Sequence, residues 1–494
     1  MIIEQFRQKT PLPCLLQGLL ERCFSAEKLD ALFERHAQTQ YIREVTFATV
    51  CDLMLGVVLK IHPTVHAAYQ HRPEPLGITV SALYEKLRNT ELAVSAGLLR
   101  DTALDLAQIL DELTGKPQPW LPGYSIRMLD GNCLAASEKR LAVHRGVAGA
   151  ALPGKSLVVL DPERNLVLEV FPCADGHAQE RRLLGAVSAT ARAGEVWMED
   201  RNFCTLGFLA ALSANAAQVI IRQHANLPFS EVTPFVPVAA HAGTIVSEQP
   251  IRVDGRHYRR IRVHLDTPTR DGEQILYLIS DLPPTIPADK IAALYRQRWT
   301  IEISFQKIEK YFKSEIETLA YPQAALFGFA LALVAYNIFS VMMAALEAAH
   351  EKPVQHELSG YYIALSISAT FLALMQLTEA VDWRFIAHQT PTEFAAWLRE
   401  TARNVSLRTL KKHPRGPKKP SSKPPHDPKQ PHVSTYQLLN PSCYLSMNPR
   451  AQAMTKHPSF SSKPRAVTEW MCFGNKRSSR LPVVSTALRA LAMR

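Results

Sequence analysis

Residues 295–313 read YRQRWTIEISFQKIEKYFK, and the rest of the chain is interpreted outward from this stretch. At 3.6 residues per turn it predicts one helix, Tyr295–Lys313, with two distinct faces. The apolar stripe consists of Ile301, Phe305, Ile308 and Phe312, and the polar stripe about a turn away consists of Tyr295, Arg298, Glu302 and Glu309. On its own, the spacing of Arg298 and Glu302 fits an exposed helical ion pair equally well.

Two aspartates upstream suggest that the polar stripe is part of a functional site. Residues 125–130 (SIRMLD) and 196–200 (VWMED) are expected to form short strands. Alternation along a strand puts each final aspartate on an apolar face: Asp130 with Ile126 and Met128, and Asp200 with Val196 and Met198. A carboxylate on such a face is costly to desolvate unless it meets a cation. Together with Glu302 the two aspartates form an oxygen-only set that suits Mg²⁺ or Mn²⁺.

These segments resemble the motifs of a known family. Tyr295-x2-Arg298-x3-Glu302 is similar to the signature of DDE transposases of the insertion-sequence-4 type, which are bacterial cut-and-paste enzymes. LDGN at 129–132 and EDRNFCT at 199–205 resemble the segments that carry the two family aspartates. The resemblance spans roughly residues 42–350. One position departs from it: the lysine expected seven residues after the glutamate is Glu309, and the neighbouring Lys310 lies about 100° further round the helix.

The resemblance implies a function and a set of site residues. Asp130, Asp200 and Glu302 are the implied catalytic residues, holding two Mg²⁺ or Mn²⁺ ions for phosphoryl transfer on DNA, with Asp130 shared between the ions. The implied DNA contacts are Tyr295, Arg298, Trp299 and Lys310. The arginine would grip a phosphate in a bidentate way, and the tryptophan would either stack on an unpaired base or pack in the core. The implied partners are double-stranded DNA, as terminal inverted repeats and as target, and a second copy of the chain in a synaptic homodimer.

The order of the expected elements indicates the fold class. Strands are expected in SIRMLDGNCLA, SLVVLDPERN, LVLEVFPC, VWMED and QVIIRQH, with helices at Ala178–Ala193 and Cys204–Ala217. Three strands, a helix, a strand, a helix and a strand is the order of an α/β fold of the ribonuclease-H-like type, which the resemblance also implies. We therefore expect a helical N-terminal DNA-binding domain (1–120), a catalytic domain (121–350) interrupted by a β-rich insertion (about 225–285), a C-terminal helical region (351–403) and a tail (404–494).

Charge is concentrated in that tail. Residues 404–494 hold 17 of the 56 Lys and Arg residues and two of the 45 Asp and Glu residues, which leaves 39 basic and 43 acidic residues in 1–403. The tail begins with a Lys- and Pro-rich run that cannot bury enough apolar area to fold, so we expect it to be mostly disordered. The eight cysteines lack zinc-site spacing, and their scatter favours a reducing, cytoplasmic setting. For a bacterial transposase this means association with the nucleoid when bound to DNA.

Two regions of the sequence leave alternatives open. Residues 78–100 fit either a helix-turn-helix that reads DNA or two packed helices. In the β-rich segment, the basic residues would either follow a DNA backbone or form the solvated face of a meander: Arg252, Arg256, His257, Arg259, Arg260 and Arg262.

Three other functions remain possible from the sequence. A structure-specific nuclease of the same fold and a catalytically silent DNA-binding protein derived from a transposase both share these motifs, and Glu309 keeps the silent protein open. A membrane protein is the third possibility, because Ala324–Leu346 has 23 residues without a formal charge. We favour a buried helix beneath the catalytic helix at this place, with no membrane partner.

Overall fold

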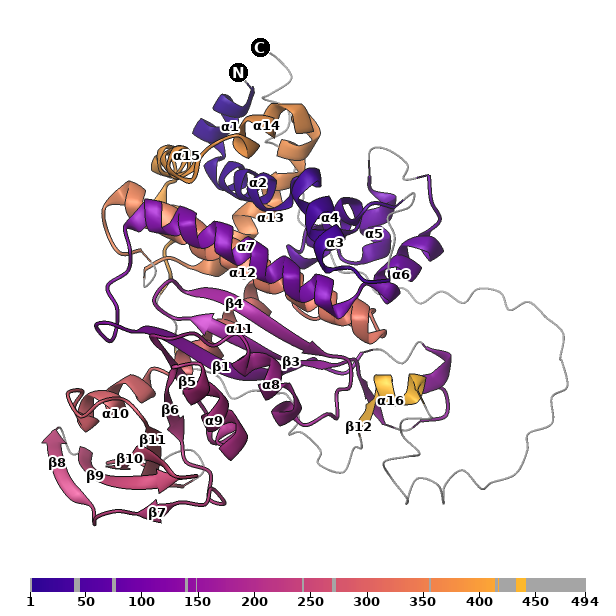
Figure 1. The fold of residues 1–494 in the computed structure, drawn as a ribbon. Coiled ribbons are helices and arrows are strands. Elements are labelled where there is room, and N and C mark those ends of the chain that lie inside the picture. Colours follow the sequence, from indigo (N-terminus) through magenta and orange to yellow (C-terminus); the bar gives the residue numbers. More distant parts are fainter. Residues whose placement is uncertain are drawn as a thin grey trace, which may run out of the picture. The chain divides into compact units, whose positions relative to one another are not determined.

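A mixed β-sheet runs through the centre of the computed structural model (Figure 1). The structure describes residues 2–39, 45–72, 77–137, 141–147, 149–241, 244–268, 272–354, 357–413, 416 and 432–440. Within these residues the sheet has ten strands, in the order β4-β3-β1-β5-β6-β11-β10-β9-β7, with β8 paired to β9. The first five are β1 (Ser125–Cys133), β3 (Lys155–Asp161), β4 (Leu166–Cys173), β5 (Glu195–Glu199) and β6 (Gln218–Arg222).

The two halves of the sheet differ in strand direction. β1, β3 and β4 are successive antiparallel neighbours, whereas β1, β5 and β6 run parallel to one another. The parallel connections pass through α8 (Leu184–Ser188) and α9 (Leu206–Ala214), because parallel neighbours need a crossover. Asp130 and Asp200 therefore lie on neighbouring parallel strands: Asp130 is inside β1, which continues past the expected end to Cys133, and Asp200 directly follows β5.

The expected strand alternation is confirmed by burial. Ile126, Met128, Val196 and Met198 belong to one core, which the sheet shares with the long helices. Leu129 and Trp197 belong to a second core on the opposite face, under α8 and α9. The first core thus lies on the face toward which Asp130 and Asp200 are predicted to point.

Helices from both ends of the chain cover the first core. The N-terminal set comprises α1 (Ile2–Lys9), α2 (Pro11–Phe24), α3 (Ala26–His36), α4 (Phe47–Val58), α5 (Val65–Gln70), α6 (Val80–Asn89) and α7 (Leu92–Thr114). The C-terminal set comprises α12 (Pro322–His350), α13 (Gly360–Leu377), α14 (Ala380–Ala387) and α15 (Pro391–Arg403). α7 and α12 lie side by side over β4 (Figure 1).

The long apolar helix α12 is a core helix, as expected. Among the described residues α12 and α13 are long and apolar enough to cross a membrane, but 94% of the most apolar window of α12 is buried inside the protein. Asn337 pairs with strand β4 like a further strand residue: Val167 N–H donates to Asn337 Oδ1 at 2.8 Å, and Asn337 Nδ2 donates to the Val167 carbonyl at 2.7 Å. Tyr336 shares a hydrogen bond of 3.0 Å with Ser304 of the candidate catalytic helix.

The predicted single helix Tyr295–Lys313 is wrong in two respects: it is broken in the middle, and it ends at Tyr311, after which Phe312 is extended. The structure has two helices, α10 (Ala288–Arg296) and α11 (Trp299–Tyr311), separated by a turn at Gln297 and Arg298. Both turn residues keep right-handed helical dihedral angles. The apolar stripe is confirmed: Ile301, Ile308 and Phe312 are buried, and Phe305 packs against the same core.

The β-rich segment continues the central sheet. It consists of β7 (Ser230–Glu231), β8 (Val236–His241), β9 (Thr244–Val253), β10 (Arg256–His264) and β11 (Ile275–Ser280). β11 pairs antiparallel with β6, and β10 and β9 follow outward. These strands therefore extend the sheet beyond β6, and the chain returns from β11 to α10.

Part of the predicted tail is folded. Residues 407–410 form a short 3-10 turn in which Leu407 and Leu410 are buried. Farther along, β12 (His432–Ser434) pairs parallel with β2 (Ala150–Leu152), and α16 (Thr435–Leu439) follows. These two short stretches contain apolar and hydroxyl side chains that can be buried. The average composition of the tail does not reveal them. The remainder of the predicted disorder lies outside the described residues.

Candidate active site

Asp130 lies inside β1, opposite Val158 of β3, in a half-buried position. Gly131 N–H donates to Asp130 Oδ1 at 2.8 Å, which orients the carboxylate. The side chain is 22% exposed. The paired part of β1 and β5 ends at Met128 and Met198, two residues before each aspartate.

Asp200 follows β5 and keeps an extended backbone, so its side chain continues the alternation of that strand. It is half-buried. The preceding Glu199 lies on the opposite face and is fully buried, with neither carboxylate oxygen hydrogen bonded within the described chain. Burial raises the pKa of Glu199 well above its ordinary value. Asp200 rather than Glu199 thus faces Asp130.

Arg298 lies between the candidate carboxylates. Its guanidinium donates to Glu302 Oε1 at 2.8 Å and lies 3.7 Å from Asp130 Oδ2. The arginine side chain is 8% exposed, and that of Glu302 is 32% exposed. The charge of Arg298 therefore stabilises carboxylates that would otherwise repel one another.

Burial dominates the electrostatics of Asp130. It raises the pKa of this carboxyl to about 6; the Gly131 amide and Arg298 act in the opposite direction, and Glu302 and Asp200 add to the rise. All three predicted acidic residues are thus close enough to influence the charge of one of them. Burial likewise raises the pKa of Tyr295, which lies near Arg298 and Asp200. Tyr295 is buried at the end of α10, with its hydroxyl beside the cluster.

The remaining predicted DNA contacts lie at two places on α11. Trp299, at the first position of the helix, is 57% exposed, and the Arg298 guanidinium lies 5.2 Å from the centre of its ring. A tryptophan this exposed is not a core residue, so the packing interpretation is wrong. Lys310 is exposed at the other end of the helix, 5.6 Å above the Tyr311 ring, and its carbonyl accepts a hydrogen bond from Lys60. Glu309 is exposed beside it.

A divalent ion fits the chemistry of the cluster, although the carboxylates are not gathered around one point. Asp130, Asp200 and Glu302 supply only oxygen donors, as Mg²⁺ and Mn²⁺ prefer. The described part of the chain contains no group of three or more His, Cys, Asp or Glu residues placed to hold a metal ion. The Arg298 guanidinium already occupies one oxygen of Glu302 through a hydrogen bond of 2.8 Å, so an ion at this carboxylate would compete with the arginine for that oxygen.

The basic residues of the β-rich segment divide into two groups. Arg252, Arg256 and His257 are exposed at the β9–β10 turn. Arg259 instead pairs with Glu248 and donates to the carbonyls of Leu282, Pro283 and Ile286. Arg260 lies over the rings of Phe229, Phe235 and Tyr277, and Arg262 over Phe235. The second group is committed to packing, so only the turn residues are available to a DNA backbone.

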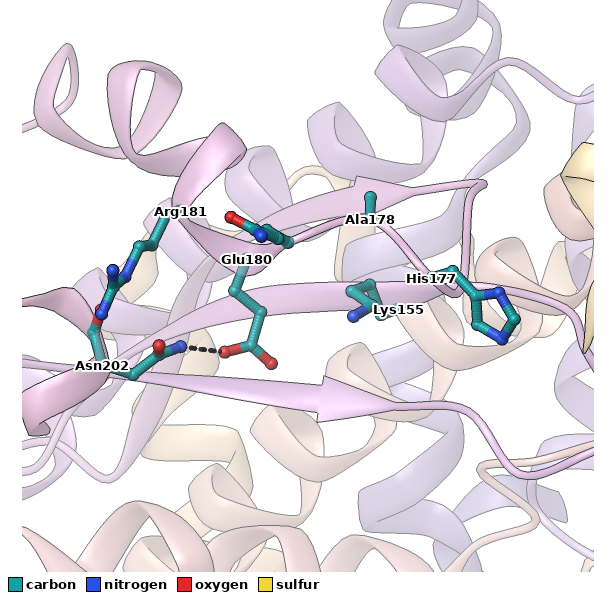
Figure 2. A pocket seen from close by; sticks show the side chains of 7 residues that line it. Lys155, His177, Ala178, Glu180, Arg181 and Asn202 are labelled. Atoms are coloured by element: carbon teal, nitrogen blue, oxygen red, sulfur yellow. Dashed lines mark hydrogen bonds between the residues drawn. The ribbon is translucent and has the colours of Figure 1, made fainter. Parts of the chain in front are cut away.

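Sequence motifs missed a further carboxylate near the site. Glu180 opens the short turn η2 (Glu180–Leu183) and borders an open pocket of about 500 Å³. The pocket is also lined by Lys155, His177, Ala178, Gln179, Arg181 and Asn202, and Figure 2 shows Glu180 hydrogen bonded to Asn202. Asn202 belongs to the EDRNFCT segment, but nothing in the sequence indicated a partner 22 residues upstream.

Comparisons with known proteins agree with this geometry. Residues 122–338 match the family described as the transposase DDE domain, and the match contains Asp130, Asp200 and Glu302. A protein of Sinorhizobium fredii (strain NBRC 101917 / NGR234), named as a candidate transposase, y4zB, is 27% identical over 166 residues. These residues are 32% of this chain and 45% of that protein, so the chain spans slightly under half of the relative's length.

Residues 122–338, slightly under half of the chain, are therefore similar to the transposase DDE domain, and this stretch contains the central sheet and the three predicted acidic residues.

Proposed function

We propose that the protein is a DNA transposase of the insertion-sequence-4 type, which cuts and joins DNA at the terminal inverted repeats of its element. The observation that carries the proposal is the approach of Asp130, Asp200 and Glu302 around Arg298, where each acidic neighbour raises the pKa of Asp130. The sheet order β4-β3-β1-β5-β6, with three antiparallel strands followed by two parallel ones, supports a ribonuclease-H-like core. The N-terminal helices would bind the repeats, and two copies of the chain would form the synaptic complex.

In this proposal Asp130, Asp200 and Glu302 would hold two Mg²⁺ or Mn²⁺ ions. Bound there, divalent ions supply an activated water or hydroxyl and stabilise the leaving oxygen of phosphoryl transfer. Gly131 orients the Asp130 carboxylate through its amide. Arg298, once released from Glu302, binds a DNA phosphate through its planar guanidinium, and the neighbouring Tyr295 hydroxyl supports it.

Two further contacts are assigned to DNA. The exposed ring of Trp299 stacks on a base beside the cleavage point, for which its 57% exposure leaves room. Lys310 binds a phosphate about three turns further along α11. The protein would act in the bacterial cytoplasm, where its substrate lies.

Cleavage of a plasmid carrying the element's inverted repeats in Mg²⁺ tests the proposal. We expect the wild type to cut at the repeat ends, and Asp130→Ala, Asp200→Ala and Glu302→Ala to bind the repeats without cutting. Asp266→Ala is the control, because this aspartate is exposed and remote in sequence from the motifs. Repeat binding without cleavage by the wild type would indicate a silent DNA-binding protein. Cleavage without any preference for the repeats would indicate a nuclease.

A further inference from the structure

The Glu180 carboxylate lies between the two segments that carry Asp130 and Asp200. One of its oxygens accepts a hydrogen bond of 2.7 Å from Nδ2 of Asn202, two residues after Asp200 (Figure 2). The other lies against Gly131, the residue after Asp130: a Cβ at position 131 would be 2.4 Å from Glu180 Oε1. Glycine at 131 therefore leaves the space that this carboxylate fills.

A second contact fixes the same place. Arg181 Nε donates to the Asn202 carbonyl at 2.7 Å, so consecutive residues of η2 hold both the side chain and the backbone of Asn202. Gly131, on the other side of Glu180, donates its amide to Asp130. A continuous series of contacts thus leads from Asp130 through Gly131 and Glu180 to Asn202.

The sheet itself does not fix the distance between the two aspartates. Parallel pairing of β1 with β5 ends at Met128 and Met198. Beyond Met128, β1 pairs only with β3. Each aspartate lies two residues beyond the last pair. Their separation therefore depends on contacts other than the strand ladder, and Glu180 is placed to provide them.

Glu180 is not itself part of the carboxylate cluster. Side chains alternate along β1, so Gly131 faces the side of the sheet opposite to Asp130. Glu180 lies on that opposite side with Lys155, whose strand neighbour is Cys133. It can therefore act on the cluster only through the backbone segments that it holds.

We propose that Glu180 is a positioning residue that holds the Asp130 and Asp200 segments at the separation needed to bind divalent ions. This proposal rests on the function proposed above, because it assigns those aspartates to the ions. Some residues orient metal ligands without touching the metal themselves. Replacing such a residue typically lowers metal affinity or activity by about 10- to 100-fold.

The test is a set of variants in the full-length protein, with Mn²⁺ binding by titration calorimetry and repeat cleavage as separate measurements. We expect Glu180→Ala to weaken Mn²⁺ binding by about 10- to 100-fold while repeat binding stays unchanged. Glu180→Gln keeps an oxygen that accepts from Asn202 and should stay near the wild type. Asn202→Asp sets two carboxylates against each other and should weaken Mn²⁺ binding. The double variant Glu180→Gln/Asn202→Asp reverses the hydrogen bond and should restore it.

Arg182→Ala is the matched control, because it changes an exposed residue of the same turn. A melting temperature for each variant separates loss of folding from loss of positioning. The proposal is overturned if Glu180→Ala binds Mn²⁺ as the wild type does, or if the double variant is no better than Asn202→Asp alone. A wild type that binds Mn²⁺ but does not cut the repeats contradicts the proposed function only, because the Mn²⁺ series still decides the role of Glu180. A wild type without Mn²⁺ binding overturns both.

Discussion

Arg298 donates a hydrogen bond of 2.8 Å to Glu302, one turn along α11. The same guanidinium lies 3.7 Å from Asp130, so one positive charge serves two of the three proposed ion ligands. An arginine in this place competes with a divalent ion for Glu302 and repels it electrostatically. Its release to a DNA phosphate would couple substrate binding to assembly of the ion site.

Replacing Arg298 with glutamine should therefore separate ion binding from cleavage. At pH 8 we expect Arg298→Gln to bind Mn²⁺ roughly tenfold more tightly, because a nearby positive charge has been removed. Cleavage at the repeats should nevertheless fall about 100-fold, since a donor to the reacting phosphate is lost. Titration calorimetry and plasmid cleavage measure the two effects, with Arg182→Gln as the control. Weaker Mn²⁺ binding by Arg298→Gln would contradict the competition.

Asp130 should make the protein less stable as the pH rises. Its pKa of about 6 in the folded protein exceeds the ordinary 3.8, so the folded state binds the proton more tightly than the unfolded chain. This stabilisation is present in full below about pH 4 and is lost as the pH rises through 6. A rise of this size corresponds to at most about 3 kcal/mol. Asp130→Asn should thus raise the melting temperature at pH 8 and leave it nearly unchanged at pH 4.

The same pKa controls the pH dependence of ion binding. A divalent ion binds the ionised carboxylate, so Mn²⁺ affinity should be constant above about pH 7 and fall below pH 6, where Asp130 must first lose its proton. Titration calorimetry between pH 5 and pH 8 measures this profile. An affinity that does not change across this range would show that Asp130 is not a ligand.

The faces of the strands could be predicted from the sequence, but the contacts between segments could not. Alternation in 125–130 correctly grouped Ile126 with Met128, because burial of one face leaves a pattern in the residues themselves. The break between α10 and α11 left no such pattern, because neither Gln297 nor Arg298 is a proline or a glycine. Both residues also keep helical backbone angles. The role of Glu180 depends on a hydrogen bond between residues 22 positions apart, which no local motif records.

The way in which the β-rich segment joins the central sheet could not be predicted from the sequence either. Alternating runs in 225–285 predicted strands, but an antiparallel partner for β6 could have been any of them. β11 takes that position because Leu278 and Ile279 are apolar on consecutive faces and can be buried on both. The sheet therefore places the segment at the far side of β6 from the aspartates.

Replacing Asn337 should lower the free energy of unfolding more than replacing a polar residue on the surface of a helix. Its amide satisfies both the N–H and the carbonyl of Val167 inside the core. Asn337→Leu leaves these two buried groups without partners, which should lower the free energy of unfolding by about 2–4 kcal/mol. Urea unfolding measures the loss, and Asn226→Ala at an exposed turn is the control. A loss below about 1 kcal/mol would mean that water replaces the amide.

The two groups of arginines on β9 and β10 should respond differently to substitution. Arg259→Ala removes the partner of Glu248 and of three carbonyls, so it should lower the melting temperature. Arg252→Ala and Arg256→Ala should leave the melting temperature unchanged and weaken DNA binding, with a shallower dependence on salt. Thermal melting and binding at two salt concentrations distinguish the two effects. If DNA binding is unchanged in both turn variants, this surface does not contact DNA and is only solvated.

Glu309 provides the most direct test of whether the substitution at the family lysine limits the enzyme. It is exposed on α11, seven residues after Glu302, and therefore lies near the same face two turns away. Burial raises the pKa of the nearby Glu315, and the negative charges of Glu309 and Glu317 add to the rise, so the surface there is acidic, whereas the resemblance calls for a phosphate-binding cation. Glu309→Lys should tighten repeat binding and steepen its salt dependence by about one to two counterions. Cleavage should rise with it, because the added cation stabilises the phosphate beside the reacting one.

Lys310→Ala distinguishes two explanations for the wild type. If Lys310 already serves as the phosphate contact, its loss should weaken repeat binding in the wild type, and Glu309→Lys should compensate in the double variant. If it does not, Lys310→Ala should change nothing, and Glu309→Lys alone should raise both binding and cleavage. Glu317→Lys is the control, because it makes the same charge change at an exposed position outside the helix. An equal gain from this control would show that net charge, rather than position 309, governs the effect.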